Sequence, residues 1–365
     1  MTVTNFLSEV KDPRNMRGKR YNLAAILRLI VAGLLCNCNN IASIARFKKF
    51  LSKKLLQNLG FYNGITPCYS TLTIMLRKMN PKDLHDAIVK VISGIKETKE
   101  FQEVHIDGKT LRGSKDLENR AIQVLTGFNN KTKCVINFEE ILNKDENKAM
   151  LEILQKFDIQ RAIITADAAF DHSDICEEII QQGADFAICL KGNEANLLRA
   201  TEQAFSNSKQ ENIRIFEKDV EYNHCRIEQR KIEVIDMPWE YLNGHRHIKQ
   251  LCRITRRREQ KNKGNYTEET AYMITSLSSS ASAEMLLDLN RKHWSCENNL
   301  NWVKDRVFME DKSTIRKDNA PIVLSLLRSF VISIIATIST KITETREYYS
   351  HYKQSVYTLF CNLRL

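Results

Sequence analysis

The feature that most constrains the fold is an alternation of apolar strand-like and helical segments between residues 103 and 190. The expected strands are Glu103–Asp107, Ile122–Phe128, Lys133–Ile141, Gln160–Ala166 and Asp185–Leu190, and the expected helices are Lys144–Phe157 and Asp174–Gln182. The turn sequence Asn-Asn-Lys-Thr joins the second and third strands and predicts a hairpin. The order β-β-β-α-β-α-β predicts an α/β fold, whose sites tend to lie at the carboxyl ends of strands.

The segments on either side have different patterns. Before residue 100, the expected helices are Asn22–Cys36, Ile41–Leu59, Cys68–Met79 and Lys82–Ile95. They form either a helix-turn-helix DNA reader or a plain helical bundle, and both interpretations stay open. After the α/β segment, Asn212–Met237 and Ile248–Leu277 alternate polar and apolar residues. We therefore expect domains at 1–100 and 101–365, the second interrupted by a β-rich insertion at about 210–280, with the basic cluster Arg253–Lys263 in an exposed hairpin loop.

Charge and composition narrow the class of protein. The net charge is +11, and residues 1–100 account for all of it with 17 Lys/Arg and 6 Asp/Glu. A basic segment of this kind suits either a polyanion ligand or a solvated surface. The longest apolar runs, Leu23–Cys36 and Val323–Ile338, each contain an arginine and are shorter than the ~20 residues of a membrane span. Ten scattered cysteines without a CxxC pair predict a reduced cytoplasmic chain without structural zinc.

Three acidic residues are the candidate catalytic and metal-binding groups. Asp107 and Asp167 each end an apolar strand, whereas Glu297 lies in the helical segment Arg291–Asp305. Mg²⁺ prefers oxygen ligands, and two such ions can stabilise the attacking and leaving oxygens of a phosphodiester displacement. The pattern indicates an enzyme that cuts or joins nucleic acid.

Each of these acids has a competing interpretation. Asp107-Gly108 is also a common turn sequence at a strand end. Asp305, Glu310 and Asp311 compete with Glu297 for the metal role. On the Glu297 helix, Trp294 and Trp302 are expected to anchor the helix in the core.

Basic and polar residues near the acids are candidate DNA contacts. Lys109 and Arg112 follow the first aspartate, and Lys191 and Asn193 follow the last strand of the α/β segment. His293 and Lys304 share one helical face with Glu297 because they lie four and seven residues from it. Arg17, Lys19 and Arg20 of the basic N-terminal segment complete the set.

Taken in order, these motifs resemble those of the H-repeat-associated family of bacterial insertion-sequence transposases, a branch of the DDE (Asp-Asp-Glu) transposases. The matching segments are KDPRNMRGKRYNLAAIL, HIDGKTLRGS, ITADAAF, AICLKGNEANL and RKHWSCENNLNWVKDRVFMEDKSTIRKDNAPIVLSLLRS. The chain departs from the family at AAFDHS, where a leucine-histidine pair and a glutamine are usual. It also has Pro67-Cys68 in place of a proline-serine pair, and Lys304 where many relatives have an apolar residue.

The resemblance implies an RNase H-like mixed sheet with helices on both faces, a β-rich insertion and an all-helical N-terminal DNA-binding domain. It places the catalytic triad on Asp107, Asp167 and Glu297, with two Mg²⁺ or Mn²⁺ ions. It also implies cleavage of DNA at element ends, transfer of the freed 3′-hydroxyl into target DNA, a homodimer on DNA, nucleoid association, and neither a membrane nor a protein partner. The alternatives are an RNase H-like nuclease that only hydrolyses DNA and a catalytically silent, transposase-derived DNA-binding protein.

Overall fold

The computed structural model contains two compact units. Unit 1 comprises residues 1–99, 108–142 and 297–365, and unit 2 comprises residues 100–107 and 143–296. The structure describes residues 10–15, 17, 19–95, 103–116, 118, 120–141, 145–156, 158–167, 173–192, 195–223, 226–238, 245–260 and 266–363. These units do not follow the expected division at residue 100, which stays a prediction.

Unit 2 is built on a mixed sheet. In hydrogen-bonded order its strands are β1 (Glu103–Thr110, of which 103–107 belong to this unit), β4 (Ile163–Ala166), β5 (Asp185–Leu190), β9 (Tyr266–Thr275), β8 (Gln250–Gln260), β7 (Arg226–Asp236) and β6 (Arg214–Asn223). The first three strands are parallel and the others antiparallel. The β-rich insertion therefore continues the core sheet through the β5–β9 pair.

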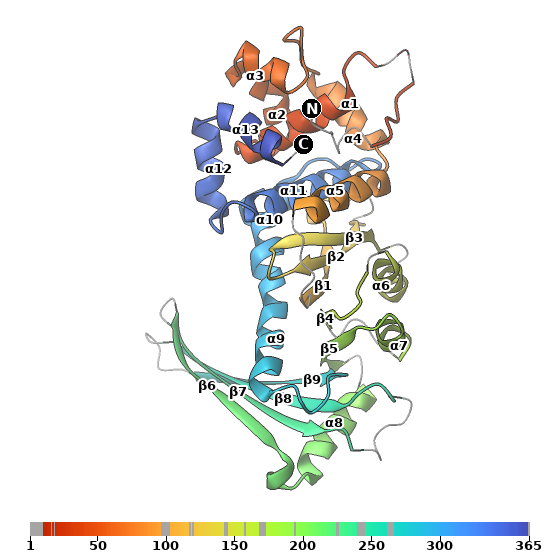
Figure 1. Ribbon diagram of the computed structural model, residues 1–365, viewed down its shortest axis with the longest axis vertical. Helices are drawn as coiled ribbons and strands as arrows, with labels where there is room; N and C mark the ends of the chain where they lie inside the picture. The colour runs from red at the N-terminus through yellow and green to blue at the C-terminus, as the bar shows by residue number, and fades with distance from the viewer. Residues whose placement is uncertain are drawn as a thin grey trace. The chain divides into compact units, whose positions relative to one another are not determined.

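Helices cover both faces of this sheet. They are α6 (Glu146–Gln155), α7 (Ser173–Gln181), α8 (Ala195–Asn207), the short η7 (Gln210–Asn212) and α9 (Ala283–Cys296). Figure 1 shows α9 on one side of β4 and β5 and the α6–α7 pair on the other. Apolar residues of α9, including Leu286, Leu287 and Leu289, pack with Ile232, Val234 and Cys252 of the sheet. Burial of this apolar surface stabilises the unit and holds α9 against the sheet.

Unit 1 is mostly helical. Its helices are α1 (Leu23–Leu35), α2 (Ile41–Phe47), η3 (Lys48–Phe50), α3 (Lys53–Asn58), α4 (Tyr69–Lys78), α5 (Pro81–Ile95), η4 (Arg112–Ser114), α10 (Trp302–Arg306), η10 (Glu310–Lys312), α11 (Ala320–Ala336), α12 (Ile342–His351) and α13 (Gln354–Asn362). The antiparallel hairpin β2 (Gln123–Asn129) and β3 (Cys134–Glu140) is also here. Helix α11 is buried on all sides and packs against α1, α4, α5 and β3. Within the described residues, no helix combines the length and apolar character that a membrane span needs.

Two local expectations were wrong. The helix predicted over Ile41–Leu59 is broken after Phe47, because the Ser52 hydroxyl caps the backbone N–H of Leu55 and starts α3 afresh. The basic cluster predicted in a hairpin loop lies instead on strand β8 as far as Gln260, and Lys261–Lys263 fall outside the described residues. Its arginines alternate between the two faces of the sheet, so they present two different surfaces.

Candidate active site

Asp107 and Asp167 follow paired positions of two neighbouring parallel strands. Ile106 of β1 is in register with Ala166 of β4, and each aspartate is the next residue along its chain. Neighbouring strands lie about 4.8 Å apart, so the two residues sit side by side where β4 ends. Strand β1 was expected to end at Asp107 but continues to Thr110, so Asp107 lies within it. Both are partly buried. Within unit 2, the structure thus brings together two of the three predicted catalytic residues.

A layer of polar side chains lies directly before the aspartates. Strand residues two apart face the same side, so His105 shares a face with Asp107, and Thr165 with Asp167. The Thr165 hydroxyl is 2.6 Å from Nδ1 of His105 and 3.1 Å from Nδ1 of His293 on α9. These bonds join β1, β4 and α9 into one polar cluster behind the acidic edge.

Asp167 carries a negative charge that acts on its neighbours. Lys191 donates a hydrogen bond of 2.6 Å to its carboxylate. Burial and the charge of Asp167 together raise the pKa of Glu146. Burial raises the pKa of the Cys189 thiol to about 11, and Asp167 adds to this effect. The edge of the sheet is therefore acidic, with Lys191 as its nearby cation.

The donor set at this edge fits a divalent cation. Mg²⁺ and Mn²⁺ prefer carboxylate oxygens as ligands, and two neighbouring negative charges attract a cation. Lys191 already places a positive charge against Asp167. Among the residues that the structure describes, no group of three His, Cys, Asp or Glu side chains is gathered closely enough to hold a metal ion by itself.

Glu297 is the first residue of a π-helical turn, Glu297–Asn301, between α9 and α10. Its side chain is exposed. A π-turn widens the helix locally and often marks a functional position. Glu297 belongs to unit 1, although its peptide neighbour Cys296 ends unit 2.

The residues that competed with Glu297 for the metal role are engaged elsewhere in unit 1. Glu310 is buried and lies 3.4–3.9 Å from three cationic side chains, Arg328, Lys109 and Lys304. Asp305 pairs with Lys109 at 2.6 Å, and Asp311 lies 4.0 Å from Arg112. Glu310 and Asp305, which are paired with buried cations, are therefore poor ligands for a further ion, whereas Asp311 lies near only the exposed Arg112.

Two predicted DNA contacts need correction. Lys304 has no exposed surface, and Lys109 is buried in the same ion cluster around Glu310. Burial lowers the pKa of Lys304, while Glu310 opposes that shift. Neither ammonium is open to a phosphate in this structure. Both side chains form ion pairs inside unit 1. The sequence could not show these pairs, because the partner residues are distant along the chain.

Most of the other predicted DNA contacts are exposed to solvent. Arg17, Lys19, Arg20, Arg112 and Lys191 are exposed. Asn193 lies outside the described residues. The tryptophans expected in the core are on the surface instead, with Trp294 55% and Trp302 54% exposed.

His293 is not the phosphate-binding cation that its helical position suggested. Burial lowers its pKa to about 4, although Asp167 acts in the opposite direction. The imidazole is therefore neutral at pH 7, where it serves as a hydrogen-bond partner of Thr165.

The depressed pKa of His293 predicts a pH-dependent stability. In the unfolded chain the imidazole takes up a proton near pH 6.5, whereas in the folded protein it does so only near pH 4. Stability should therefore fall as the pH drops from about 6.5 towards 4, by at most about 3 kcal/mol from this group. Urea unfolding at pH 7 and pH 4.5 should show a smaller acid loss for His293→Asn than for wild type. The exposed His351→Asn is the matched control, and an equal loss in all three proteins would contradict this role.

Sequence reasoning missed His105, Thr165 and Glu146. The first two could have been found, because a histidine and a threonine each stand two residues before an aspartate in otherwise apolar strands. Glu146 carried no such pattern, since its position near Asp167 depends on how α6 packs.

The fold and the paired aspartates have the features of an RNase H-like protein. A family model described as "Transposase DDE domain" matches residues 99–333, and one described as "DDE_Tnp_1-associated" matches residues 4–92. The chain belongs to the DDE transposase family, in agreement with the resemblance of its motifs. This membership supports an enzyme of the nuclease/transposase kind that depends on divalent metal ions and has DNA as its partner.

Three relatives align with nearly the whole chain. "Putative protein YbfL" and "H repeat-associated putative transposase YhhI", both of Escherichia coli (strain K12), are each 30% identical over 344 residues, covering 90% of this chain and 89% of theirs. "Putative transposase YncI" of Escherichia coli O157:H7 is 26% identical over 346 residues, covering 92% of this chain and 87% of its own.

Proposed function

We propose that this protein cleaves DNA at the ends of an insertion sequence and joins the freed 3′-hydroxyl to target DNA. Asp107, Asp167 and Glu297 are the proposed metal ligands and catalytic residues. The observation that carries the proposal is the β1–β4 register, in which Ile106 pairs with Ala166, so that Asp107 within β1 and Asp167 directly after β4 are the next residues of two neighbouring strands. Glu297 is included because its segment resembles the glutamate-bearing motif of the family and lies within the matched transposase domain.

Divalent cations, Mg²⁺ or Mn²⁺ and two in number in this proposal, would supply charge stabilisation at the phosphate and an activated oxygen nucleophile. The protein's part is to hold the ligands in place. The β1–β4 register keeps Asp107 and Asp167 adjacent, and the Thr165 bonds to His105 and His293 fix the polar layer behind them. Lys191, exposed beside Asp167, is placed to hold a DNA phosphate.

The proposal includes a homodimer on DNA, because joining two element ends requires both to be held at once. The N-terminal helices and the segment before α1, in which Arg17, Lys19 and Arg20 are exposed, are proposed to hold the element ends. Size-exclusion chromatography with light scattering, with and without an end duplex, tests the dimer. A complex that contains one protein copy would contradict it.

A strand-transfer reaction tests the proposed activity. A labelled duplex that carries the terminal repeat from the DNA beside the gene is incubated with the protein, target plasmid and Mg²⁺ or Mn²⁺. We expect nicked ends and joined products, both abolished by EDTA. Nicks without joined products would favour a nuclease that only hydrolyses DNA. Binding without any cleavage by wild type would favour the silent DNA-binding protein.

A further inference from the structure

The insertion sheet carries a row of cationic side chains on the face that α9 covers. We call Arg230 of β7, Arg256 and Arg258 of β8, and Arg291 of α9 the arginine row. Arg256 is in register with Arg230, and Arg258 with Glu228. Two residues after Arg230 on β7 and two residues before Arg256 on β8, the same face continues into buried Ile232 and Ile254 under α9. The arginine row thus lies beyond the core on the same face.

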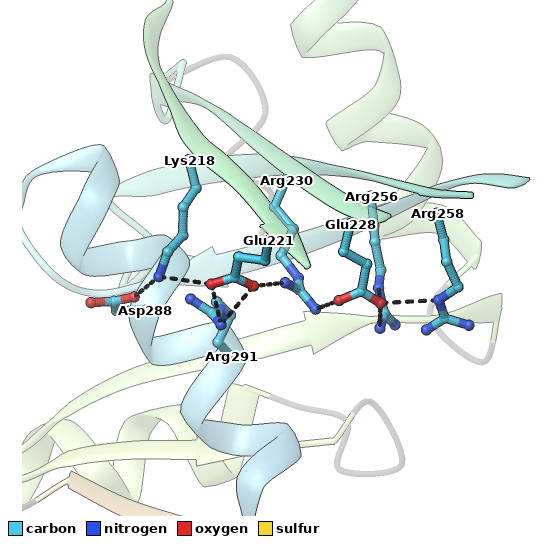
Figure 2. A network of polar contacts seen from close by, with 8 residues as sticks. All are labelled: Lys218, Glu221, Glu228, Arg230, Arg256, Arg258, Asp288 and Arg291. Carbon is cyan, nitrogen blue, oxygen red and sulfur yellow. Dashed lines mark hydrogen bonds and ion pairs between the residues drawn. The ribbon is translucent and has the colours of Figure 1, made fainter. Parts of the chain in front are cut away.

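Two carboxylates connect this row. Glu228 pairs with Arg230, Arg256 and Arg258, at 2.5 Å for the first and 3.0 Å for the last. Glu221 pairs with Arg230 at 2.8 Å, Arg291 at 2.9 Å and Lys218 at 3.4 Å, and Lys218 also lies 4.0 Å from Asp288. Figure 2 shows the eight side chains as one chain of contacts across the sheet. Each glutamate balances one charge but holds three cationic groups.

Four of the five cations are also more exposed than the two glutamates that hold them, whereas the side chain of Arg230 is only 16% exposed. The side chains of Arg256, Arg258, Arg291 and Lys218 are 27–33% exposed, whereas those of Glu228 and Glu221 are 16% and 24% exposed. Exposed Glu269, in register with Arg256, adds one further carboxylate at the margin. When Glu269 is counted, five cations (the four of the arginine row and Lys218) face four acids (Glu221, Glu228, Asp288 and Glu269). The surface is positive, and the acids mainly orient the guanidinium groups.

The opposite face of the same strands is different. There, Arg257 pairs with Glu268 at 2.5 Å, and Arg253 pairs with Glu233 at 2.7 Å. Glu233 also pairs with Lys231 at 3.2 Å, whereas Glu268 pairs with Arg257, so Arg257 provides a control on the opposite face of the same strand.

We propose that the arginine row is a binding track for the sugar-phosphate backbone of duplex DNA. Guanidinium groups bind phosphate through two parallel hydrogen bonds, and a preformed row lowers the entropy cost of ordering them. Arg291 stands two residues before His293, so the track begins next to the polar layer of the candidate site. Because its groups match phosphates, the contact is independent of base sequence. This proposal rests on the proposed function for the identity of the DNA substrate.

The salt dependence of DNA binding tests the track. Binding of a fluorescent 30-base-pair duplex of mixed sequence is followed by anisotropy from 50 to 300 mM NaCl, without divalent ions. The variant Arg256→Gln/Arg258→Gln leaves Arg230 to pair with Glu228. We expect its affinity to fall roughly tenfold at 0.1 M salt, and the slope of log K against log salt to become shallower by about one to two. Arg257→Gln should bind as wild type does.

A second variant separates charge from architecture. Arg256→Lys/Arg258→Lys keeps both charges and should restore most of the salt slope, while thermal unfolding confirms that each variant is folded. A wild-type slope for the double glutamine variant, an equal loss for Arg257→Gln, or no recovery by the lysines would overturn the track. These measurements require no cleavage. The track can therefore fail while the strand-transfer reaction succeeds, and the reverse can also occur.

Discussion

Asp107→Asn is expected to abolish metal-dependent DNA cleavage while leaving the protein folded. Ligands of catalytic cations support several kcal/mol of transition-state stabilisation, and each 1.4 kcal/mol corresponds to a factor of ten. The loss in cleavage rate should therefore be about 10³-fold or more. Removing one of two neighbouring negative charges relieves repulsion, so the melting temperature without metal should be unchanged or higher. A rate assay on the end duplex and a thermal melt of the same preparation check both statements.

Matched variants make this result specific. Asp167→Asn and Glu297→Gln should lose cleavage to a similar extent, whereas Asp158→Asn should cleave normally. Asp158 is exposed, and its side chain accepts a hydrogen bond from the backbone of Gln160, which asparagine can replace. Cleavage by Asp107→Asn at the wild-type rate with Mg²⁺ would overturn the site assignment. Normal activity of Glu297→Gln alone would remove the third ligand and leave the aspartate pair.

Glu310→Gln is expected to cause the largest loss of stability. Burial alone raises the pKa of Glu310, but Lys304, Arg328 and Lys109 reverse this effect and leave the pKa below its ordinary value. Glutamine would leave these cations without their shared counter-charge in a buried site. Breaking a buried ion pair in this way typically costs about 3–5 kcal/mol. Urea unfolding at pH 7 measures the change.

An exposed pair provides the comparison. Glu344 lies 3.0 Å from Lys341, and both side chains are about two-thirds exposed. Glu344→Gln should therefore change the unfolding free energy by less than about 1 kcal/mol. Adding Lys304→Met to Glu310→Gln should recover part of the stability, because it removes one of the uncompensated buried cations. Equal stability of Glu310→Gln and wild type would contradict the charge-balancing role of this carboxylate.

Much of the fold and part of the site could be predicted from local patterns. Apolar strands of period two and helices of period 3.6 are encoded by neighbouring residues, so β4, β5 and α1 lie where they were expected and β1 begins where it was expected. Asp107 and Asp167 could be proposed as site residues because each follows an apolar run, although β1 continues beyond Asp107 to Thr110. The resemblance to the family's motifs favoured Glu297, whose helical setting the periodicity had already indicated.

Contacts between distant residues were decided only by the tertiary structure. Lys109 and Lys304 look like surface cations in sequence, yet each is buried against Glu310. The basic cluster of β8 looked like a loop, because its glutamate partners are on β7 and β9. The periodicity of apolar residues is a property of residues that are close together in the sequence. Its burial, pKa and ion pairs depend on residues that only folding brings near, and here those long-range contacts determine which cations remain available to DNA.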